Sequence, residues 1–146
     1  PRFIDGQTGD RGSRHAAPVT IATIRILSDG HLCTMQWIAL DSLEQLDALD
    51  ARSEGTPVLI FKHSTRCSIS SAALARVERA WTPEDAMAHP VYYLDLLQYR
   101  TLSNAIAERY GVEHASPQIL VIKNGRCSYN ESHFGIRYSD VKLALG

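Results

Sequence analysis

The 146 residues of this chain are enough for one domain with its own hydrophobic core. With 45% hydrophobic residues, 21% charged residues and a formal net charge of −1, the composition is that of an ordinary globular protein. No apolar run approaches the roughly 18 residues of a membrane-spanning helix, and no basic segment leads into a signal-peptide core. We therefore expect no nucleic-acid partner, no membrane partner and a cytoplasmic location.

The cysteines indicate a reduced protein. Cys33, Cys67 and Cys127 are an odd number of cysteines at wide spacing. That pattern fits neither a secreted disulfide framework nor a zinc-ligand motif. We therefore expect free thiols and no metal site.

The first 34 residues differ from the rest of the chain. Positions 1–18 are rich in Gly, Arg, Asp and Ser without periodicity, which predicts a flexible tail, and residues 19–27 form a possible extra strand. We interpret residues 1–34 as an N-terminal extension, or as the product of a translation start placed too far upstream. Residues 35–146 then form the folded domain.

A first strand and helix are expected at the start of this domain. Residues 36–40 are a short strand candidate, and Asp41 and Glu44 have the spacing of a capping box. The helix that follows stops before Gly55. Three leucines supply its apolar stripe: Leu43, Leu46 and Leu49.

The next strand and helix place a cysteine at their junction. Residues 58–61 are an unbroken apolar run, typical of a strand covered on both faces. Apolar residues then recur at every fourth position and predict a helix: Ile69, Ala73, Val77 and Trp81. Cys67 falls at the changeover, where unpaired amides and the positive helix end stabilise a thiolate. This position predicts a reactive cysteine.

Polar residues around Cys67 are candidates for the same site. Lys62, His63 and Arg66 would add positive charge if their side chains turned toward the sulfur, although we expect Lys62 and Arg66 to be solvated. His63 would be either a proton relay or a hydrogen-bonded structural residue. Ser70 stands where a dithiol enzyme carries its second cysteine, and it would either donate a hydrogen bond to the thiolate or be a plain first-turn residue.

The second half of the domain continues the alternation. Residues 82–85 resemble a helix cap with proline in the first turn, followed by a short helix or linker. Residues 91–96 are the third strand candidate, and a helix over 100–110 ends at Gly111. A last helical turn is expected over 139–145.

The closing strands form a hairpin. Residues 118–123 and 126–131 are strand candidates, and Asn124-Gly125 between them suits a type I′ turn. Strands joined through helices should lie parallel, while the hairpin adds an antiparallel edge. The expected fold is therefore α/β and thioredoxin-like: a central mixed sheet of four to five strands flanked by helices. Ser116-Pro117 lies just before the fourth strand, where that plan carries a cis proline facing the catalytic sulfur.

At this level of detail, residues 36 to 145 resemble the monothiol bacilliredoxins, also described as YtxJ-like proteins of the bacillithiol redox system. The most specific block is 60–70, Ile-Phe-Lys-His-Ser-Thr-Arg-Cys-Ser-Ile-Ser. It is similar to the family's phenylalanine-lysine-histidine-serine segment and the threonine-cysteine-proline-isoleucine-serine motif that follows it. Ser116-Pro117-Gln118 and Ser132-His133 also resemble family blocks. Arg66 stands where threonine is common and Ser68 where proline is common, and these flanking residues shape the partner thiol and the redox potential.

This resemblance implies a monothiol thiol–disulfide oxidoreductase. Cys67 would attack a mixed disulfide between bacillithiol and a client protein, and Ser70 in the fourth place of the motif would prevent an internal disulfide. No cofactor would be bound; bacillithiol would be a co-substrate, and a low-molecular-weight thiol or another redoxin would be the reductant. The implied substrate-binding residues are Lys62, His63, Arg66, Ser68, Ser116 and Pro117.

Two functions of other classes stay open. The cysteine-x-x-serine pattern also resembles monothiol glutaredoxins, which hold an iron–sulfur cluster between two subunits, although their glycine-phenylalanine between the cysteine and the serine is absent here. The second is a non-catalytic thioredoxin-like interaction module in which Cys67 is buried and inert. Cys127 is a poor candidate for a resolving cysteine, because the last strand of the expected fold lies far from the active helix.

Overall fold

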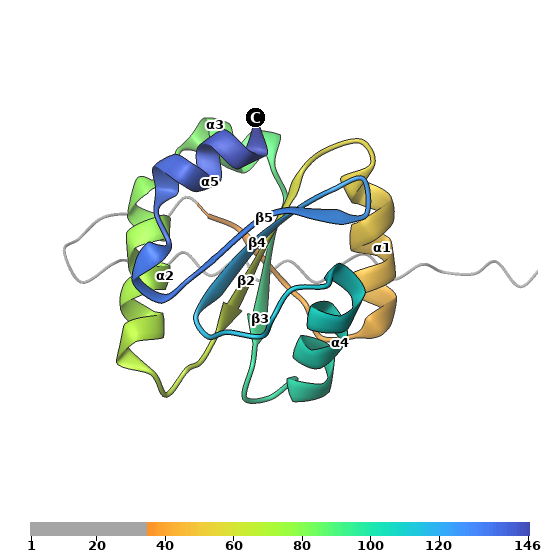
Figure 1. The fold of residues 1–146 in the computed structure, drawn as a ribbon. Coiled ribbons are helices and arrows are strands. Elements are labelled where there is room, and N and C mark those ends of the chain that lie inside the picture. Colours follow the sequence, from red (N-terminus) through yellow and green to blue (C-terminus); the bar gives the residue numbers. More distant parts are fainter. Residues whose placement is uncertain (1–34) are drawn as a thin grey trace, which may run out of the picture.

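The structure is a computed structural model that describes residues 35–146 (Figure 1). The possible strand at 19–27 and Cys33 lie outside these residues. None of the helices in the described part is long and apolar enough to cross a lipid bilayer. The elements follow one another in the order β1 (Trp37–Ala39), α1 (Leu43–Ser53), β2 (Val58–His63), α2 (Ser68–Ala80), α3 (Pro83–Ala88), β3 (Val91–Asp95), α4 (Arg100–Tyr110), β4 (Gln118–Lys123), β5 (Arg126–Ser132), η1 (His133–Gly135) and α5 (Tyr138–Leu145).

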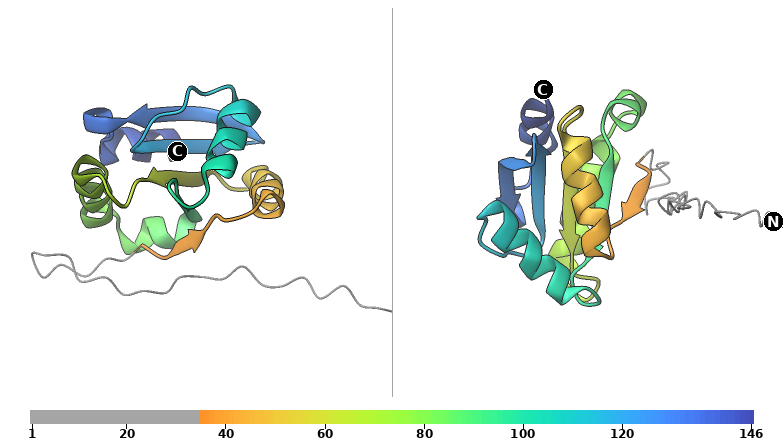
Figure 2. Two further views of the ribbon diagram at one scale, coloured as in Figure 1. Left: turned by 90° about the horizontal axis from the view of Figure 1, so that it is seen from below. Right: turned by 90° about the vertical axis from the view of Figure 1, so that its right-hand side faces the viewer.

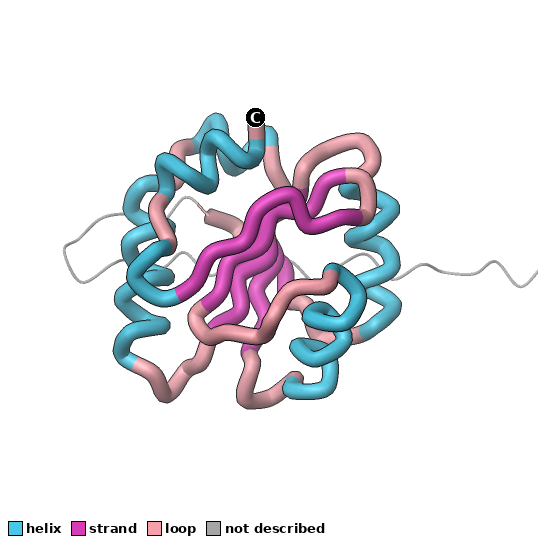
Figure 3. Tube along the Cα trace, viewed as in Figure 1, coloured by secondary structure: helices cyan, strands magenta, loops and turns pink. Residues whose placement is uncertain are grey.

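The strands form one mixed sheet in the order β1-β3-β2-β4-β5. β3 pairs in parallel with β1 and β2, whereas β4 is antiparallel to both β2 and β5. Figure 3 shows the strands as one twisted band with helices on both sides. The expected α/β sheet flanked by helices is confirmed.

The direction of β4 corrects our expectation that every strand joined through a helix lies parallel. Helix α4 ends near the end of α1, where the Tyr110 hydroxyl lies 2.5 Å from Oδ1 of Asp50. The chain then runs back along 111–117 to the carboxyl end of β2, where Gln118 pairs with Lys62. Helix α4 runs along the sheet in one direction and the loop returns in the other. β4 therefore starts at the end of the sheet where β2 ends.

Helices cover the sheet on both faces (Figure 2). Side chains alternate along β2, so Leu59 and Phe61 pack with α2 and α5, while Val58 and Ile60 pack with α1 and α4. All four are fully buried. This double covering is the reason for the unbroken apolar run at 58–61.

Helix α1 begins one residue later than the expected capping box. Ser42 is its N-cap and accepts from the Gln45 amide at 3.3 Å, while the Gln45 side chain accepts from the Asp41 amide at 2.8 Å. The expected pair of Asp41 and Glu44 is therefore wrong. Leu43 is 54% exposed because it lies in the first turn, whereas the other two leucines of the stripe are buried.

The apolar stripe of α2 is confirmed except at its start. Ala73 and Val77 are buried, and so is Trp81, which is the C-cap just beyond the helix. Ile69, in the first turn of α2, is 39% exposed.

The segment after α2 is a helix, α3, with the expected cap. Thr82 and Asp85 form a capping box. Asp85 is fully buried, accepts from the Tyr138 hydroxyl at 2.6 Å and also bonds to Lys142. Burial alone would raise the pKa of the Asp85 carboxyl, but the bonds from Lys142 and Tyr138 lower it to about 2. The carboxylate thus ties α3 to α5.

The later boundaries agree closely with the sequence. Helix α4 ends at Gly111, whose φ of 62° is the left-handed conformation of a C-cap. Asn124 and Gly125 have φ values of 51° and 68°, as the expected type I′ turn requires. The predicted final helical turn is α5.

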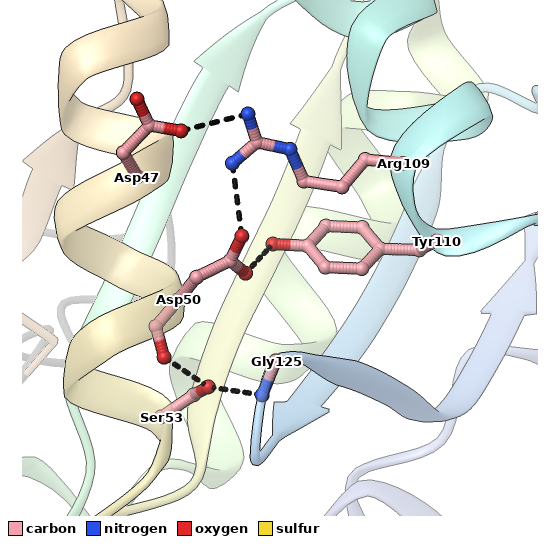
Figure 4. A network of polar contacts seen from close by, with 6 residues as sticks. All are labelled: Asp47, Asp50, Ser53, Arg109, Tyr110 and Gly125. Carbon is pink, nitrogen blue, oxygen red and sulfur yellow. Dashed lines mark hydrogen bonds and ion pairs between the residues drawn. The ribbon is translucent and has the colours of Figure 1, made fainter.

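A polar cluster joins α1, α4 and the β4–β5 hairpin (Figure 4). The Arg109 guanidinium lies 2.7 Å from Asp47 and 2.9 Å from Asp50. Asp50 also meets the Tyr110 hydroxyl, while Ser53 Oγ accepts from the Gly125 amide at 2.8 Å. These contacts fix the end of α4 and therefore the start of the returning loop.

Candidate active site

Cys67 is the N-cap of the 13-residue helix α2, as expected from the change in periodicity. Its backbone is extended, with φ of −107° and ψ of 119°. Its amide donates to the Ser64 carbonyl at 3.1 Å, and its carbonyl accepts from the Ser71 amide at 3.1 Å. The thiol is free and partly exposed. The sulfur is therefore carried at the helix end where first-turn amides lack intrahelical partners and the dipole is positive.

Ser70 lies fully buried on the first turn of the same helix. Its Oγ accepts from the Ser64 amide at 3.0 Å and lies 2.7 Å from Nδ1 of His63. The hydroxyl therefore ties the loop before Cys67 to the end of β2. Its single hydrogen goes to His63 when Nδ1 is unprotonated and is available to another acceptor when Nδ1 carries the proton.

His63 lies in a buried aromatic setting. Its side chain is on the α2 face of the sheet, and its ring centroid is 6.3 Å from that of Phe61 and 5.5 Å from that of Tyr93. Only 5% of the residue is exposed. These contacts support the structural reading of His63, and its role as a proton relay stays a prediction.

Lys62 is fully buried, which corrects the expectation that it is solvated. Successive residues of a strand point to opposite faces, so Lys62 lies on the α1 and α4 face while His63 lies on the α2 face. Its Nζ is 2.9 Å from Nδ1 of His114 and 3.1 Å from Oε1 of Gln118. Lys62 is thus on the side of the sheet away from the helix that Cys67 begins.

The other two flanking residues have the exposure expected of contacts to a substrate. Arg66 and Ser68 are both exposed, one on each side of Cys67. They are therefore accessible to a molecule that approaches the sulfur.

The Ser116–Pro117 peptide bond is cis, as predicted. It directly precedes Gln118, the partner of Lys62 in β2, so it lies at the carboxyl end of β2 that leads to Cys67. The Pro117 carbonyl accepts from the His133 amide at 3.1 Å. Ser116 Oγ is shielded from solvent and has no hydrogen-bond partner among residues 35–146.

Two residues near this loop, His114 and Phe134, were not found from the sequence, and Gln118 was noted only as part of a family block. His114 and Gln118 both contact the Lys62 amine. The lysine at the end of a buried apolar strand could have indicated such partners, since a buried amine requires hydrogen-bond acceptors. Phe134, in the turn after β5, is 73% exposed, and its neighbour His133 has a φ of 53°. The sequence analysis marked Ser132-His133 at the start of that turn and did not single out Phe134.

Cys127 lies away from this site. It pairs with Ile122 near the hairpin turn, whereas the other end of β5, at Ser132, pairs with Gln118. Five residues of strand span about 17 Å, far beyond the roughly 7 Å between Cα atoms that a disulfide allows. Burial raises the pKa of the Cys127 thiol, which donates to the Tyr129 carbonyl at 3.2 Å.

Comparison with solved structures gives the class of protein. A candidate oxidoreductase with a thioredoxin fold is 31% identical, covers 75% of this chain and 93% of its own, and has a TM-score of 0.64. Thioredoxin from Fasciola hepatica is 15% identical over 73% of this chain and 94% of its own, with a TM-score of 0.57. Thioredoxin from Malassezia sympodialis is 18% identical over 73% of this chain and 85% of its own, with a TM-score of 0.55. The chain has the thioredoxin fold.

The family follows from a second comparison. The family model described as monothiol bacilliredoxin BrxC matches residues 38–141. This chain therefore belongs to the monothiol bacilliredoxin family, and both its family and its fold are those of redox proteins.

Proposed function

We propose that this protein is a monothiol thiol–disulfide oxidoreductase that removes bacillithiol, or a similar low-molecular-weight thiol, from mixed disulfides on client proteins. The observation that carries this proposal is a free, partly exposed Cys67 at the start of α2 with a serine in the fourth place of its motif. Cys67 lies at the helix end where the first-turn amides lack intrahelical partners, and a cysteine thiolate is the group that attacks a disulfide.

The first step is an exchange of one disulfide for another. The electron pair of the Cys67 thiolate forms a bond to the bacillithiol sulfur, and the pair of the broken bond leaves on the client sulfur. The client thiolate takes a proton from water, and bacillithiol stays on Cys67 as a mixed disulfide. The step needs no bound cofactor, because bacillithiol itself is the co-substrate.

The second step requires a thiol from outside the protein. Ser70 has no sulfur, and Cys127 lies too far along β5 to resolve the intermediate. A low-molecular-weight thiol or another redoxin therefore attacks the mixed disulfide and restores the Cys67 thiolate. A reducing compartment such as the cytoplasm would supply that thiol.

The remaining candidate residues have different roles in this proposal. Arg66 and Ser68 flank the sulfur at the surface, and the Arg66 guanidinium suits the carboxylates of bacillithiol. The backbone of Ser116 and Pro117 aligns the incoming disulfide as an added strand. Ser70 and His63 hold the loop before Cys67 through their hydrogen bonds. Lys62, on the opposite face, takes no direct part in binding.

Intact mass spectrometry tests the proposal. The reduced protein is incubated separately with oxidised bacillithiol, oxidised glutathione and the disulfide of coenzyme A, and the adduct is mapped by proteolysis. We expect one bacillithiol adduct, located on Cys67 and removed by added thiol. The Cys127→Ser variant is the matched control and should take up the same adduct. No adduct on Cys67 with any of the three disulfides would refute the proposal, and visible absorbance of freshly purified protein would indicate an iron–sulfur carrier instead.

A further inference from the structure

We propose that Lys62 is a positioning residue for the loop 111–117, whose buried amine fixes the segment that presents Ser116 and Pro117 to a substrate disulfide at Cys67. This inference rests on the proposed function. It assigns a role to a buried cationic side chain that the exchange chemistry itself does not use.

One nitrogen atom contacts both the middle of this loop and the first residue after it. Nζ of Lys62 lies 2.9 Å from Nδ1 of His114 and 3.1 Å from Oε1 of Gln118. His114 comes three residues before Pro117, and Gln118 directly follows it. Since the backbone of Lys62 pairs with Gln118 in the β2–β4 ladder, its amine links His114 in the loop to the sheet.

The chemistry of an ammonium fixes the orientation of both partners. It has three donors and no acceptor, so Nδ1 of His114 and Oε1 of Gln118 must both accept. The amide nitrogen of Gln118 then faces the other way, where it donates to the Glu113 carbonyl at 2.9 Å. Oε1 of Gln118 also accepts from the Ala115 amide at 3.4 Å. The Gln118 side chain thus connects the Lys62 amine to the backbone of the loop.

The same contacts anchor the loop to α4. Ser103 Oγ, which is on this helix and in a fully buried residue, lies 3.2 Å from Nδ1 of His114. Burial, followed by the charges of Lys62 and Arg100, lowers the pKa of His114, which keeps its imidazole neutral and able to accept. A neutral His114 therefore accepts a hydrogen bond from the Lys62 amine and connects it to the loop.

Lys62 acts through the loop and not on the sulfur. Its side chain is on the α1 and α4 face of the sheet, whereas Cys67 begins α2 on the other face. Burial lowers the pKa of Lys62 to about 8, which means that burying the charged amine costs the protein stability. A methionine would fill the same strand position without that cost, but it would leave His114 and Gln118 without their donor.

The test compares Lys62→Met with Tyr138→Phe, a control that removes a hydrogen bond to buried Asp85 on the other face of the sheet. Amide hydrogen exchange is measured over 111–118 and over α1. Exchange kinetics are measured with a protein–bacillithiol disulfide, and the alkylation rate of Cys67 is measured with iodoacetamide. The exposed residue His114 provides a second variant, His114→Ala, which removes one acceptor and keeps the test valid if Lys62→Met does not fold.

We expect hydrogen exchange over 111–118 to accelerate by about tenfold or more in Lys62→Met, with α1 unchanged, because local opening free energies respond to lost local bonds. The kcat/KM for the protein disulfide should fall about tenfold, mainly through KM, the size expected for lost bonds to a charged group. Alkylation of Cys67 should stay within about twofold, since small reagents do not use the loop. His114→Ala should give a smaller change in the same segment.

Two results would overturn the inference. One is hydrogen exchange over 111–118 that rises no more in Lys62→Met than in Tyr138→Phe. The other is a fall in Cys67 alkylation as large as the fall in turnover, which would place the effect of Lys62 on the sulfur. If the wild-type protein releases no bacillithiol at all, the proposed function fails, while the hydrogen-exchange result still decides whether Lys62 positions the loop.

Discussion

The hydroxyl of Ser70 lies 2.7 Å from Nδ1 of His63, and both side chains are buried. The same oxygen accepts from the Ser64 amide, so it satisfies two groups at the turn between β2 and α2. The serine that stands where a dithiol enzyme has its second cysteine therefore fastens the loop that carries Cys67.

Replacing Ser70 with alanine should lower the free energy of unfolding by roughly 1–3 kcal/mol, because the Ser64 amide and the buried His63 imidazole each lose the hydrogen bond to this hydroxyl. Urea denaturation measures this loss. Ser71→Ala is the matched control, since Ser71 is exposed and its hydroxyl only bonds to the Cys67 carbonyl at 3.3 Å. Equal stability of the two variants would contradict the fastening role.

Cys127 should react with iodoacetamide more slowly than Cys67 at pH 7. Burial raises the pKa of the Cys127 thiol, so its thiolate fraction at that pH is below that of an ordinary cysteine. Cys67 is partly exposed at the start of α2. Timed alkylation with peptide mapping measures both rates, and faster labelling of Cys127 in the folded protein would contradict this ranking.

The contribution of Lys62 to the free energy of unfolding should grow as pH rises from 8 toward 10.5. Burial lowers the pKa of Lys62 from 10.5 to about 8, so between these values the unfolded state binds more protons than the folded state. The full difference corresponds to roughly 3 kcal/mol. Urea denaturation of the wild type and of Lys62→Met across this range measures the contribution as the difference between the two pH dependences. An identical pH dependence in both proteins would show that Lys62 is not the group responsible.

Local patterns predicted most of the fold because they depend on neighbours in the chain. The bounds of α4 and β4 and the Asn124-Gly125 turn follow from periodicity and turn chemistry, and the structure agrees. The direction of β4 did not follow from such patterns. It depends on where α4 ends against α1, through Asp50 and Tyr110, and that contact lies between distant parts of the sequence.

The candidate site was predictable for a similar reason, and only in part. The position of Cys67 at the start of α2 follows from the switch between strand and helix periodicity. The burial of Lys62 did not follow, because its acceptors come from residues 52 and 56 positions further along the chain. From the sequence alone, a lysine at the end of an apolar strand is expected to be solvated. Only the fold shows that His114 and Gln118 lie beside it.

The central claim is that Cys67 alone performs the exchange, and release of bacillithiol from a modified client protein tests it most directly. Three single variants, Cys67→Ser, Cys127→Ser and Cys33→Ser, are assayed with reducing thiol in excess, so that turnover does not depend on an internal resolving cysteine. We predict that Cys67→Ser abolishes release, because a serine hydroxyl cannot form the mixed disulfide, and that the other two variants stay nearly as active as the wild type. Strong loss of activity in Cys127→Ser, with the fold intact by circular dichroism, would contradict the monothiol mechanism.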